Sequence, residues 1–197
     1  MKQALDKEER DRKKEREKAA KEKEKRDKAA LENAKKEQEQ QEESKRLDGR
    51  MLMFLHKAKD NATPNAYSLS GLELGGPRTQ ILAKIVAYNT TLMTLHLSRK
   101  NIQDKEGQDL ARALLTNKTL RKLELEGNCL GLMSAKAFAH ALRHNYTLRY
   151  LDLESNNLCH EGEENQGIED MISALAQNTT LLSLNLANNK IDDQTGH

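Results

Sequence analysis

Two histidines, His140 and His144, are four residues apart in a stretch with helical periodicity, which is the spacing of paired zinc ligands on a helix. Cys159 and His160 follow them in the chain. The glutamate of an H-E-x-x-H site is missing, because Ala-Leu-Arg separates the two histidines. We therefore expect histidines that face solvent or pack against loops, and we predict neither a metal site nor another cofactor.

The sequence contains no motif of an enzyme. It has neither a G-x-S-x-G nucleophile elbow nor a Walker phosphate loop, and Gly75-Gly76-Pro77 has the composition of a turn. Five Asn-x-Thr triplets could be taken for glycosylation acceptors, at Asn61, Asn89, Asn117, Asn145 and Asn178. The N-terminus carries no secretory signal, and four of these triplets open a repeated phrase, so we expect them to be structural. We predict that the protein is not an enzyme.

Acidic residues alternate with leucines at two places in the chain. Glu124 and Glu126 flank one leucine, and Asp152 and Glu154 flank another. Successive side chains of a strand point to opposite faces, so the two carboxylates of each pair would lie on the face opposite to the leucine between them. Parallel neighbouring strands, about 4.8 Å apart, would bring all four into one negative patch that suits a basic or Arg-bearing protein segment. The alternative is an ordinary solvated surface.

A repeat accounts for the leucines. Asn-x-Thr-Leu opens units at residues 89, 117, 145 and 178, which are 28, 28 and 33 residues apart. The pattern L-x-x-L-x-L-x-x-N-x-L runs through three of these units, over residues 120–130, 148–158 and 181–191. In an earlier unit, over residues 92–102, Lys100 stands at the position of the asparagine. A first, degraded unit has its leucines at residues 69, 72 and 74.

These units resemble the leucine-rich repeats of the ribonuclease-inhibitor type over residues 67–197. The resemblance implies an α/β solenoid with parallel strands on the concave side and helices on the convex side. The later half of each unit supports this, because it carries apolar residues at helical spacing and neither half can bury its apolar face alone. The resemblance also implies an asparagine ladder through Asn128, Asn156 and Asn189, and Lys100 puts its first rung in doubt.

On such a solenoid the residues between the strand leucines face the concave side. We predict that this face binds a protein partner, with no nucleic acid and no membrane involved. The predicted protein-binding residues are Glu73, His96, Lys122, Glu124, Glu126, Tyr150, Asp152, Glu154 and Asn185.

Residues 1–48 differ from the repeats in composition. The first fifty residues hold 18 of the 33 Lys and Arg residues and 15 of the 31 Asp and Glu residues. Large aliphatic residues are too few for a heptad, but eight acid-to-base pairs at i,i+4 could support an isolated helix. These pairs are Asp6–Arg10, Glu8–Arg12, Glu9–Lys13, Glu17–Lys21, Glu22–Arg26, Glu24–Lys28, Glu32–Lys36 and Glu42–Arg46. The segment is predicted to be either a single charged helix or a disordered arm.

Residues 49–66 are predicted to be a connector with an apolar cap. Gly49 ends the charged segment, and the apolar run of residues 51–55 could cover the open end of the solenoid. The alternative is a linear interaction motif. Five extra residues around 159–167 predict an enlarged surface loop in the third complete unit. The sequence stops where a fourth helix should begin, so we expect a fragment of a longer protein or an end that a partner caps.

Composition limits the compartment and the class of partner. The net charge is +2, which gives no support for nucleic-acid binding, and no apolar run is long enough for a signal sequence or a membrane span. Two cysteines without a C-x-x-C motif fit free thiols in a reducing compartment. We therefore predict a cytoplasmic protein, in the cytoskeleton or a cilium.

The function predicted first is a non-catalytic scaffold that binds a protein through its concave face and tethers it within a larger cytoskeletal or ciliary (axonemal) assembly. A second possibility is a GTPase-activating protein of the Ran-activator type, since repeat arcs of this type occur there. The third is a tropomodulin-like actin-end binder. It ranks last because the N-terminal segment lacks amphipathic helices that could bind filaments.

Overall fold

The computed structural model describes residues 22–23, 25–26, 28, 32–33, 35–36, 49–69, 72, 74–159 and 165–191. The chain divides into two compact units, Met1–Arg46 and Leu47–His197. All described residues of the first unit are helical and exposed. Two of the eight predicted ion pairs join them, Glu22–Arg26 at 3.4 Å and Glu32–Lys36 at 3.2 Å. Each of the other six pairs includes a residue outside the described ranges. Most of the predicted arm at 1–48 also lies outside these ranges.

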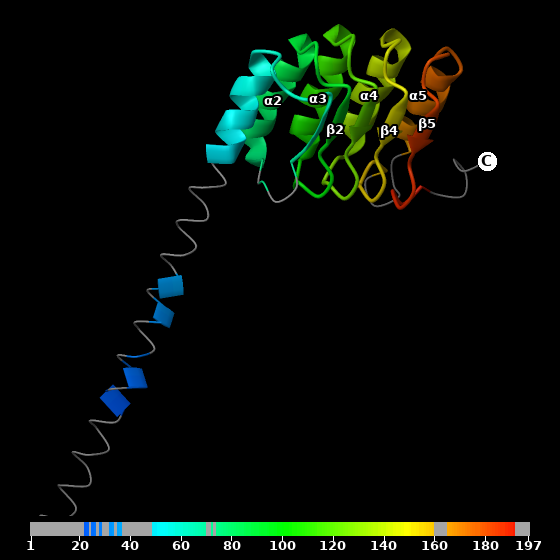
Figure 1. Cartoon of the computed structure of the whole chain (residues 1–197). Helices are drawn as coiled ribbons and strands as arrows, with labels where there is room; N and C mark the ends of the chain where they lie inside the picture. The colour runs from blue at the N-terminus through cyan, green and yellow to red at the C-terminus, as the bar shows by residue number, and fades with distance from the viewer. Residues whose placement is uncertain are drawn as a thin grey trace, which may run out of the picture. The chain divides into compact units, whose positions relative to one another are not determined.

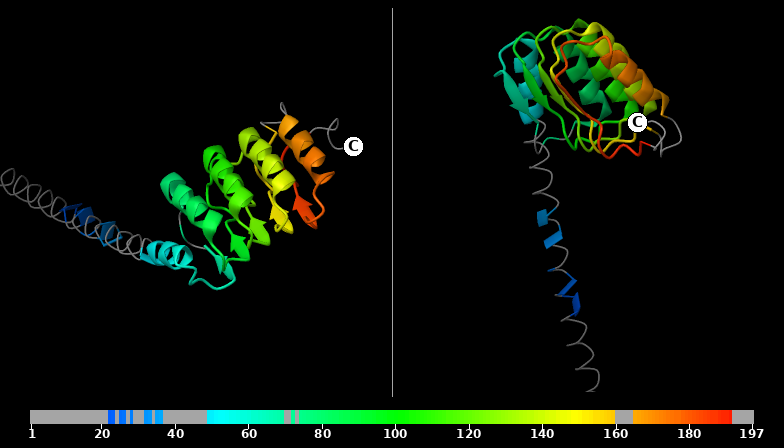
Figure 2. Two further views of the ribbon diagram at one scale, coloured as in Figure 1. Left: turned by 90° about the horizontal axis from the view of Figure 1, so that it is seen from above. Right: turned by 90° about the vertical axis from the view of Figure 1, so that its right-hand side faces the viewer.

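The second unit alternates strands with helices, as the repeat pattern predicts (Figure 1). Its strands form one parallel sheet in the order β1-β2-β3-β4-β5. The helices α2 to α5 lie side by side in a second layer that covers one face of this sheet (Figure 2). The elements are β1 (Ala66–Ser68), α2 (Gly75–Tyr88), β2 (Thr94–His96), α3 (Asp104–Thr116), β3 (Lys122–Glu124), α4 (Leu132–His144), β4 (Tyr150–Asp152), α5 (Gln166–Leu175) and β5 (Ser183–Asn185). The predicted α/β repeat fold is confirmed.

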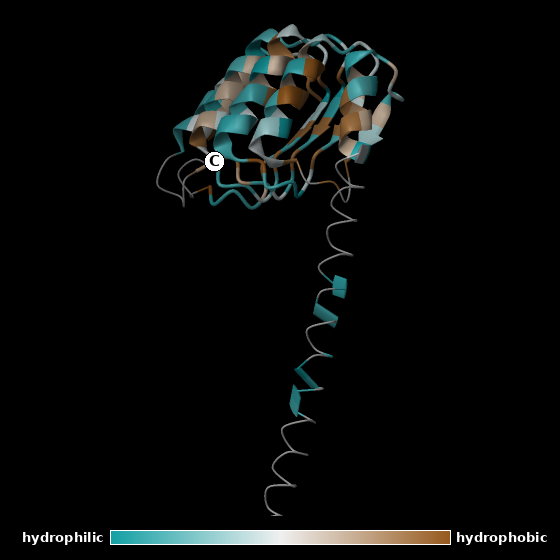
Figure 3. Ribbon diagram, turned by 90° about the vertical axis from the view of Figure 1, so that its left-hand side faces the viewer, coloured by the Kyte–Doolittle hydropathy of each residue, from teal (hydrophilic) through white to brown (hydrophobic). Residues whose placement is uncertain are grey.

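The core lies between the two layers. Leu95, Leu123 and Leu151 are register neighbours on adjacent strands and are all buried. The helices contribute side chains such as Phe138 and Met171, which are both fully buried. Apolar stretches of the strands and of the helix faces meet here, while polar residues cover much of the outer helix surface (Figure 3). Each unit thus buries its apolar half only by stacking on its neighbours.

The first repeat begins earlier than the sequence pattern predicts. Tyr67 pairs in register with Leu95, so the strand of this repeat is β1, and the alignment of the first unit on leucines 69, 72 and 74 is wrong. The leucine pattern does not reveal this strand, because Tyr67 occupies the inward position where the other strands have leucine. Asn61-Ala62-Thr63 is the opening phrase of the unit, 28 residues before the next one, and the Thr63 hydroxyl lies 2.9 Å from the Thr91 hydroxyl.

An asparagine ladder joins the loops that follow the strands, as the resemblance implies. The side-chain amide of Asn128 donates to the Leu97 and Leu125 carbonyls at 2.9 and 2.8 Å, and its oxygen accepts from the Lys100 backbone N–H. Asn156 and Asn189 repeat these bonds one and two units later. The three asparagines are buried, so their bonds are shielded from water and fix the spacing between units.

A second ladder, at the ends of the helices, uses the asparagines of the Asn-x-Thr phrases. Asn117 donates to the Val86 and Asn89 carbonyls at 2.6 and 3.0 Å and accepts from the Leu120 N–H at 2.7 Å. The same arrangement recurs at Asn89, Asn145 and Asn178. The side chains of Asn89, Asn117 and Asn145 are buried and carry these bonds, so their amide nitrogens are inaccessible to a glycosyl donor in the folded domain.

Residues 49–59 form a helix where the apolar cap is predicted. Met51, Phe54, Leu55 and Ala58, at the i, i+3, i+4, i+7 spacing of one helix face, are buried in the common core. The Phe54 ring stacks on that of Tyr67, with 4.2 Å between centroids. None of the helices in the described ranges combines the length and the apolar composition that crossing a membrane requires.

The extra residues of the third complete unit leave the sheet unchanged. Tyr150 and Ser183 are register partners although 33 residues separate them, against 28 for Lys122 and Tyr150. The difference is absorbed between β4 and α5, and residues 160–164 of this segment lie outside the described ranges.

Candidate protein-binding surface

The solvent side of the sheet, called here the strand face, carries the predicted binding residues in two columns. The register places His96, Glu124, Asp152 and Asn185 next to one another on β2 to β5. Ser68 of β1 precedes His96 in this column, at the place predicted for Glu73. Glu73 itself lies outside the described residues.

The second column runs parallel to the first, two residues earlier on each strand. It holds Thr94, Lys122, Tyr150 and Ser183. Tyr150 keeps 44% of its surface exposed, so its ring offers apolar contact area in the middle of a charged face. Glu126 and Glu154 lie just beyond the strand ends. Apart from Glu73, the predicted residues therefore share one surface.

The carboxylate of Glu124 is held by two neighbours. One oxygen bonds Nδ1 of His96 and the other lies 2.6 Å from Nζ of Lys122. Burial acts to raise the pKa of Glu124, but these two bonds outweigh it and lower the pKa below its usual value. The same bond to Glu124 raises the pKa of Lys122. The centre of the face is therefore an ion-paired network.

Two further carboxylates are paired with residues of the turns that follow the strands. Arg99 donates to Glu126 at 2.8 Å, and this bond raises the pKa of the guanidinium. Glu154 accepts from the side-chain amides of Asn185 and Asn188 at 2.9 and 3.1 Å. Most of the predicted negative patch is thus matched by donors from the chain itself.

Arg99 and Asn188 were missed by sequence reasoning. Both adopt positive φ, 58° in each case, in turns from which their side chains bond Glu126 and Glu154. A signal was present, because each stands three residues after a predicted face residue, His96 for one and Asn185 for the other.

A basic edge borders the columns where the strands begin. Arg121 and Arg149 precede β3 and β4, and the backbone N–H of Arg149 bonds the Arg121 carbonyl at 2.8 Å. Met93 and Leu182 hold the same position in the units on either side and are exposed by 46% and 64%. The strand face therefore presents cations and apolar groups at one edge and paired carboxylates at its centre.

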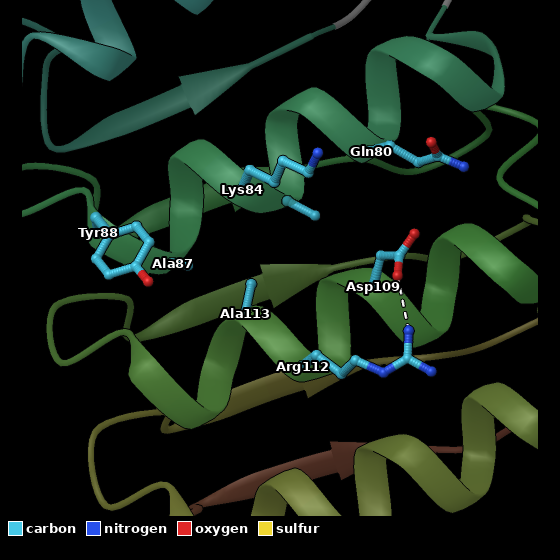
Figure 4. A pocket seen from close by; sticks show the side chains of 8 residues that line it. Gln80, Lys84, Ala87, Tyr88, Asp109, Arg112 and Ala113 are labelled. Atoms are coloured by element: carbon cyan, nitrogen blue, oxygen red, sulfur yellow. Dashed lines mark hydrogen bonds and ion pairs between the residues drawn. The ribbon is translucent and has the colours of Figure 1, made fainter.

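The described part of the second unit has a hollow on each side of the sheet. One, of about 260 Å³, opens on the strand face and is lined by Ser68, His96, Ser98, Lys100 and Glu124. The other, of about 300 Å³, lies on the helix side between α2 and α3 (Figure 4). Three alanines line it together with longer polar side chains, and two of these, Arg112 and Asp109, bond each other at 2.8 Å.

His140 and His144 are exposed on α4, with 4.8 Å between ring centroids in an edge-to-face arrangement. Their predicted companion His160 lies outside the described residues, and Cys159 is a buried thiol. Within the described ranges, no group of three or more His, Cys, Asp or Glu side chains could hold a metal ion.

Comparisons with known proteins identify the repeats. A family model described as leucine-rich repeat matches residues 116–139, 144–162 and 177–194. No curated protein matches the sequence.

Two solved structures share the fold of the second unit. One is leiomodin-1 actin-binding site 2, which is 23% identical. The match covers 67% of this chain and 76% of the leiomodin chain, with a TM-score of 0.59. The other is the tropomodulin C-terminal domain of Caenorhabditis elegans, which is 17% identical. The match covers 70% of this chain and 82% of the tropomodulin chain, with a TM-score of 0.61. The chain therefore contains an α/β domain with leucine-rich repeats, which is similar in fold to leiomodin-1 actin-binding site 2 and to the tropomodulin C-terminal domain.

Proposed function

We propose that the repeat domain is a non-catalytic protein-binding module, that it binds through the strand face, and that its partner is actin. The fold similarity to a leiomodin domain named as an actin-binding site is the observation that carries the choice of partner. It favours the tropomodulin-like function over the general scaffold that the sequence ranks first. The missing amphipathic helices concern the first unit only, so they do not weigh against actin binding by the second.

The strand face has the physical properties of a docking surface. Its charged side chains come from short strands in fixed register, and ion pairs hold several of them in one orientation. Such preorganisation lowers the entropy cost of binding. Because carboxylates and cations alternate across the face, we expect the partner to present charges of both signs, including the Arg-bearing segment predicted from the sequence.

Binding of actin to the full chain is the direct test, by cosedimentation with filaments and by a fluorescence titration with monomers. In the double variant Glu124→Lys/Asp152→Lys we expect at least a tenfold weaker affinity, since two central carboxylates become like charges to a basic segment. The matched control is Asp60→Lys/Glu169→Lys, which changes two exposed acidic residues outside the strand face by the same total charge.

Three results would contradict the proposal. They are no binding of either form of actin, an equal loss in the control variant, and an unchanged affinity in the strand-face variant. Faster GTP hydrolysis by a Ran-type GTPase in the presence of the chain would instead support the GTPase-activating alternative. A cytoskeletal location follows from the proposal and is tested by co-localisation of the tagged full chain with actin filaments in cells.

A further inference from the structure

Lys100 departs from the repeat in a way that creates a polar hollow. It occupies the position of the ladder asparagines, yet only its backbone joins the ladder, donating to the Asn128 side-chain oxygen at 2.9 Å. Its side chain instead lines the hollow of about 260 Å³ on the strand face, together with Ser68, His96, Ser98 and Glu124. An asparagine turned into the ladder would leave this space without a cation.

The ammonium group of Lys100 has no counter-ion in the hollow. No side chain in the described part of the chain lies within ion-pair distance of it, although the residue is half-buried. Burial lowers the pKa of Lys100 below its usual value, in keeping with this absence of an ion pair. The one carboxylate that lines the hollow, Glu124, is already bonded to His96 and to Lys122 at 2.6 Å.

We propose that this hollow binds a carboxylate side chain, Asp or Glu, of the protein partner. One carboxylate supplies the single negative charge that Lys100 lacks, and the Ser98 hydroxyl can donate a second hydrogen bond to it. A phosphate group carries more charge and would stand close to the Glu124 carboxylate, so it fits the hollow less well. The inference deepens the proposed function, and it rests on that function only in taking the ligand to be part of a protein.

Lys100→Asn separates binding from folding. The substitution introduces the residue that the ladder carries in the three later units, so we expect a thermal midpoint that is unchanged or higher, with the ammonium lost. A Lys100→Glu variant reverses the charge, and Lys105→Asn is the matched control at an exposed lysine of α3.

The probe is N-acetylglutamate methylamide, titrated into the full chain with isotope-labelled lysine side chains and followed by NMR. The Lys100 signal, identified by its absence in Lys100→Asn, should shift and saturate, while the Lys105 signal should shift at least fivefold less. The uncharged N-acetylglutamine methylamide should have no effect. An equal shift of both lysines, an equal effect of the uncharged probe, or tighter binding of inorganic phosphate would overturn the proposal.

The same variants in the actin assay distinguish this inference from the proposed function. We expect Lys100→Asn to weaken actin binding about tenfold, Lys100→Glu to weaken it further, and Lys105→Asn to leave it unchanged. If the unaltered chain does not bind actin, the proposed function fails and the NMR titration still tests the hollow. If the chain binds actin and Lys100→Asn binds equally well, the inference fails and the proposed function stands.

Discussion

Asn117 shows how much of the fold depends on single polar side chains. Its amide donates to the Val86 and Asn89 carbonyls, which belong to two earlier units, and its oxygen accepts from two backbone N–H groups of its own turn. Truncation would remove this partner from the Asn89 carbonyl and from the Thr119 and Leu120 N–H groups, and each buried group left unsatisfied costs about 1–3 kcal/mol. We expect Asn117→Ala to lower the free energy of unfolding by about 2–4 kcal/mol in urea denaturation.

The exposed Asn65 is the control for this substitution. Asn65→Ala should change the stability by less than about 1 kcal/mol, because it is a surface position without a positive φ. Equal losses in the two variants would show that the ladder contributes little.

Glu124 should make the stability of the domain depend on pH. Its pKa is lower in the folded state than its usual value, so its contribution is complete above the usual pKa and is lost as the pH falls through the lowered value. We expect Glu124→Gln to cost about 1 kcal/mol at pH 7 and clearly less at about pH 2.5, far below the usual pKa of a glutamate. Urea denaturation of both proteins at the two pH values measures this, and a pH-independent difference would contradict the role of the ion pairs.

The helix over residues 49–59, called here the cap helix, contributes to stability mainly through one buried ring. It buries Phe54 almost completely against Tyr67 and the first repeat, while Leu52 on its other side is 58% exposed. We expect Phe54→Ala to destabilise the domain by about 3–5 kcal/mol, since it removes a large buried ring. Leu52→Ala should cost less than about 1 kcal/mol. Similar thermal midpoints for the two variants would show that the helix does not protect the core.

Close packing between α3 and α4 depends on Gly107. A Cβ atom there would lie 2.2 Å from Oγ of Ser134 and 2.6 Å from Cδ2 of Leu130. Ser134 cannot move freely, because its hydroxyl donates to the Asp104 carbonyl at 2.7 Å. We expect Gly107→Ala to destabilise the domain by about 1–3 kcal/mol in denaturant unfolding, as overpacking does.

A second glycine serves as the comparison. Gly49 is helical and nothing lies within 4 Å of a Cβ atom there, so Gly49→Ala should be neutral or stabilising by up to about 1 kcal/mol. A loss of stability of similar size in Gly107→Ala and Gly49→Ala would contradict the packing explanation.

Across the whole repeat domain, burial falls off toward β5. Leu123 and Leu125 are buried, whereas the equivalent Leu184 and Leu186 are half-buried. Less buried elements open more readily in a repeat protein, in which each unit is stabilised by its neighbours. We expect the amides of β5 to exchange hydrogen at least tenfold faster than those of β3, measured by mass spectrometry. Equal protection would indicate that the domain opens only as a whole.

The sequence predicts this domain well wherever a residue repeats at a fixed period. The alternation of strands and helices follows from the spacing of the apolar residues, and the ladder of Asn128, Asn156 and Asn189 is what the resemblance to leucine-rich repeats implies. The first repeat was misplaced because Tyr67 replaces a leucine, and the pairing of Glu126 with Arg99 depends on a turn conformation that no periodicity reports. Spacing thus predicts which side chains share a surface, but not which of their charges are already satisfied.

The five additional residues before α5 have a practical consequence for labelling. Both asparagine ladders and the strand register continue across this unit through residues on either side of the five added positions. A peptide epitope or fluorophore-binding tag placed there should leave the strand face intact. The domain therefore offers its own attachment point for single-molecule measurements of the partner on its surface.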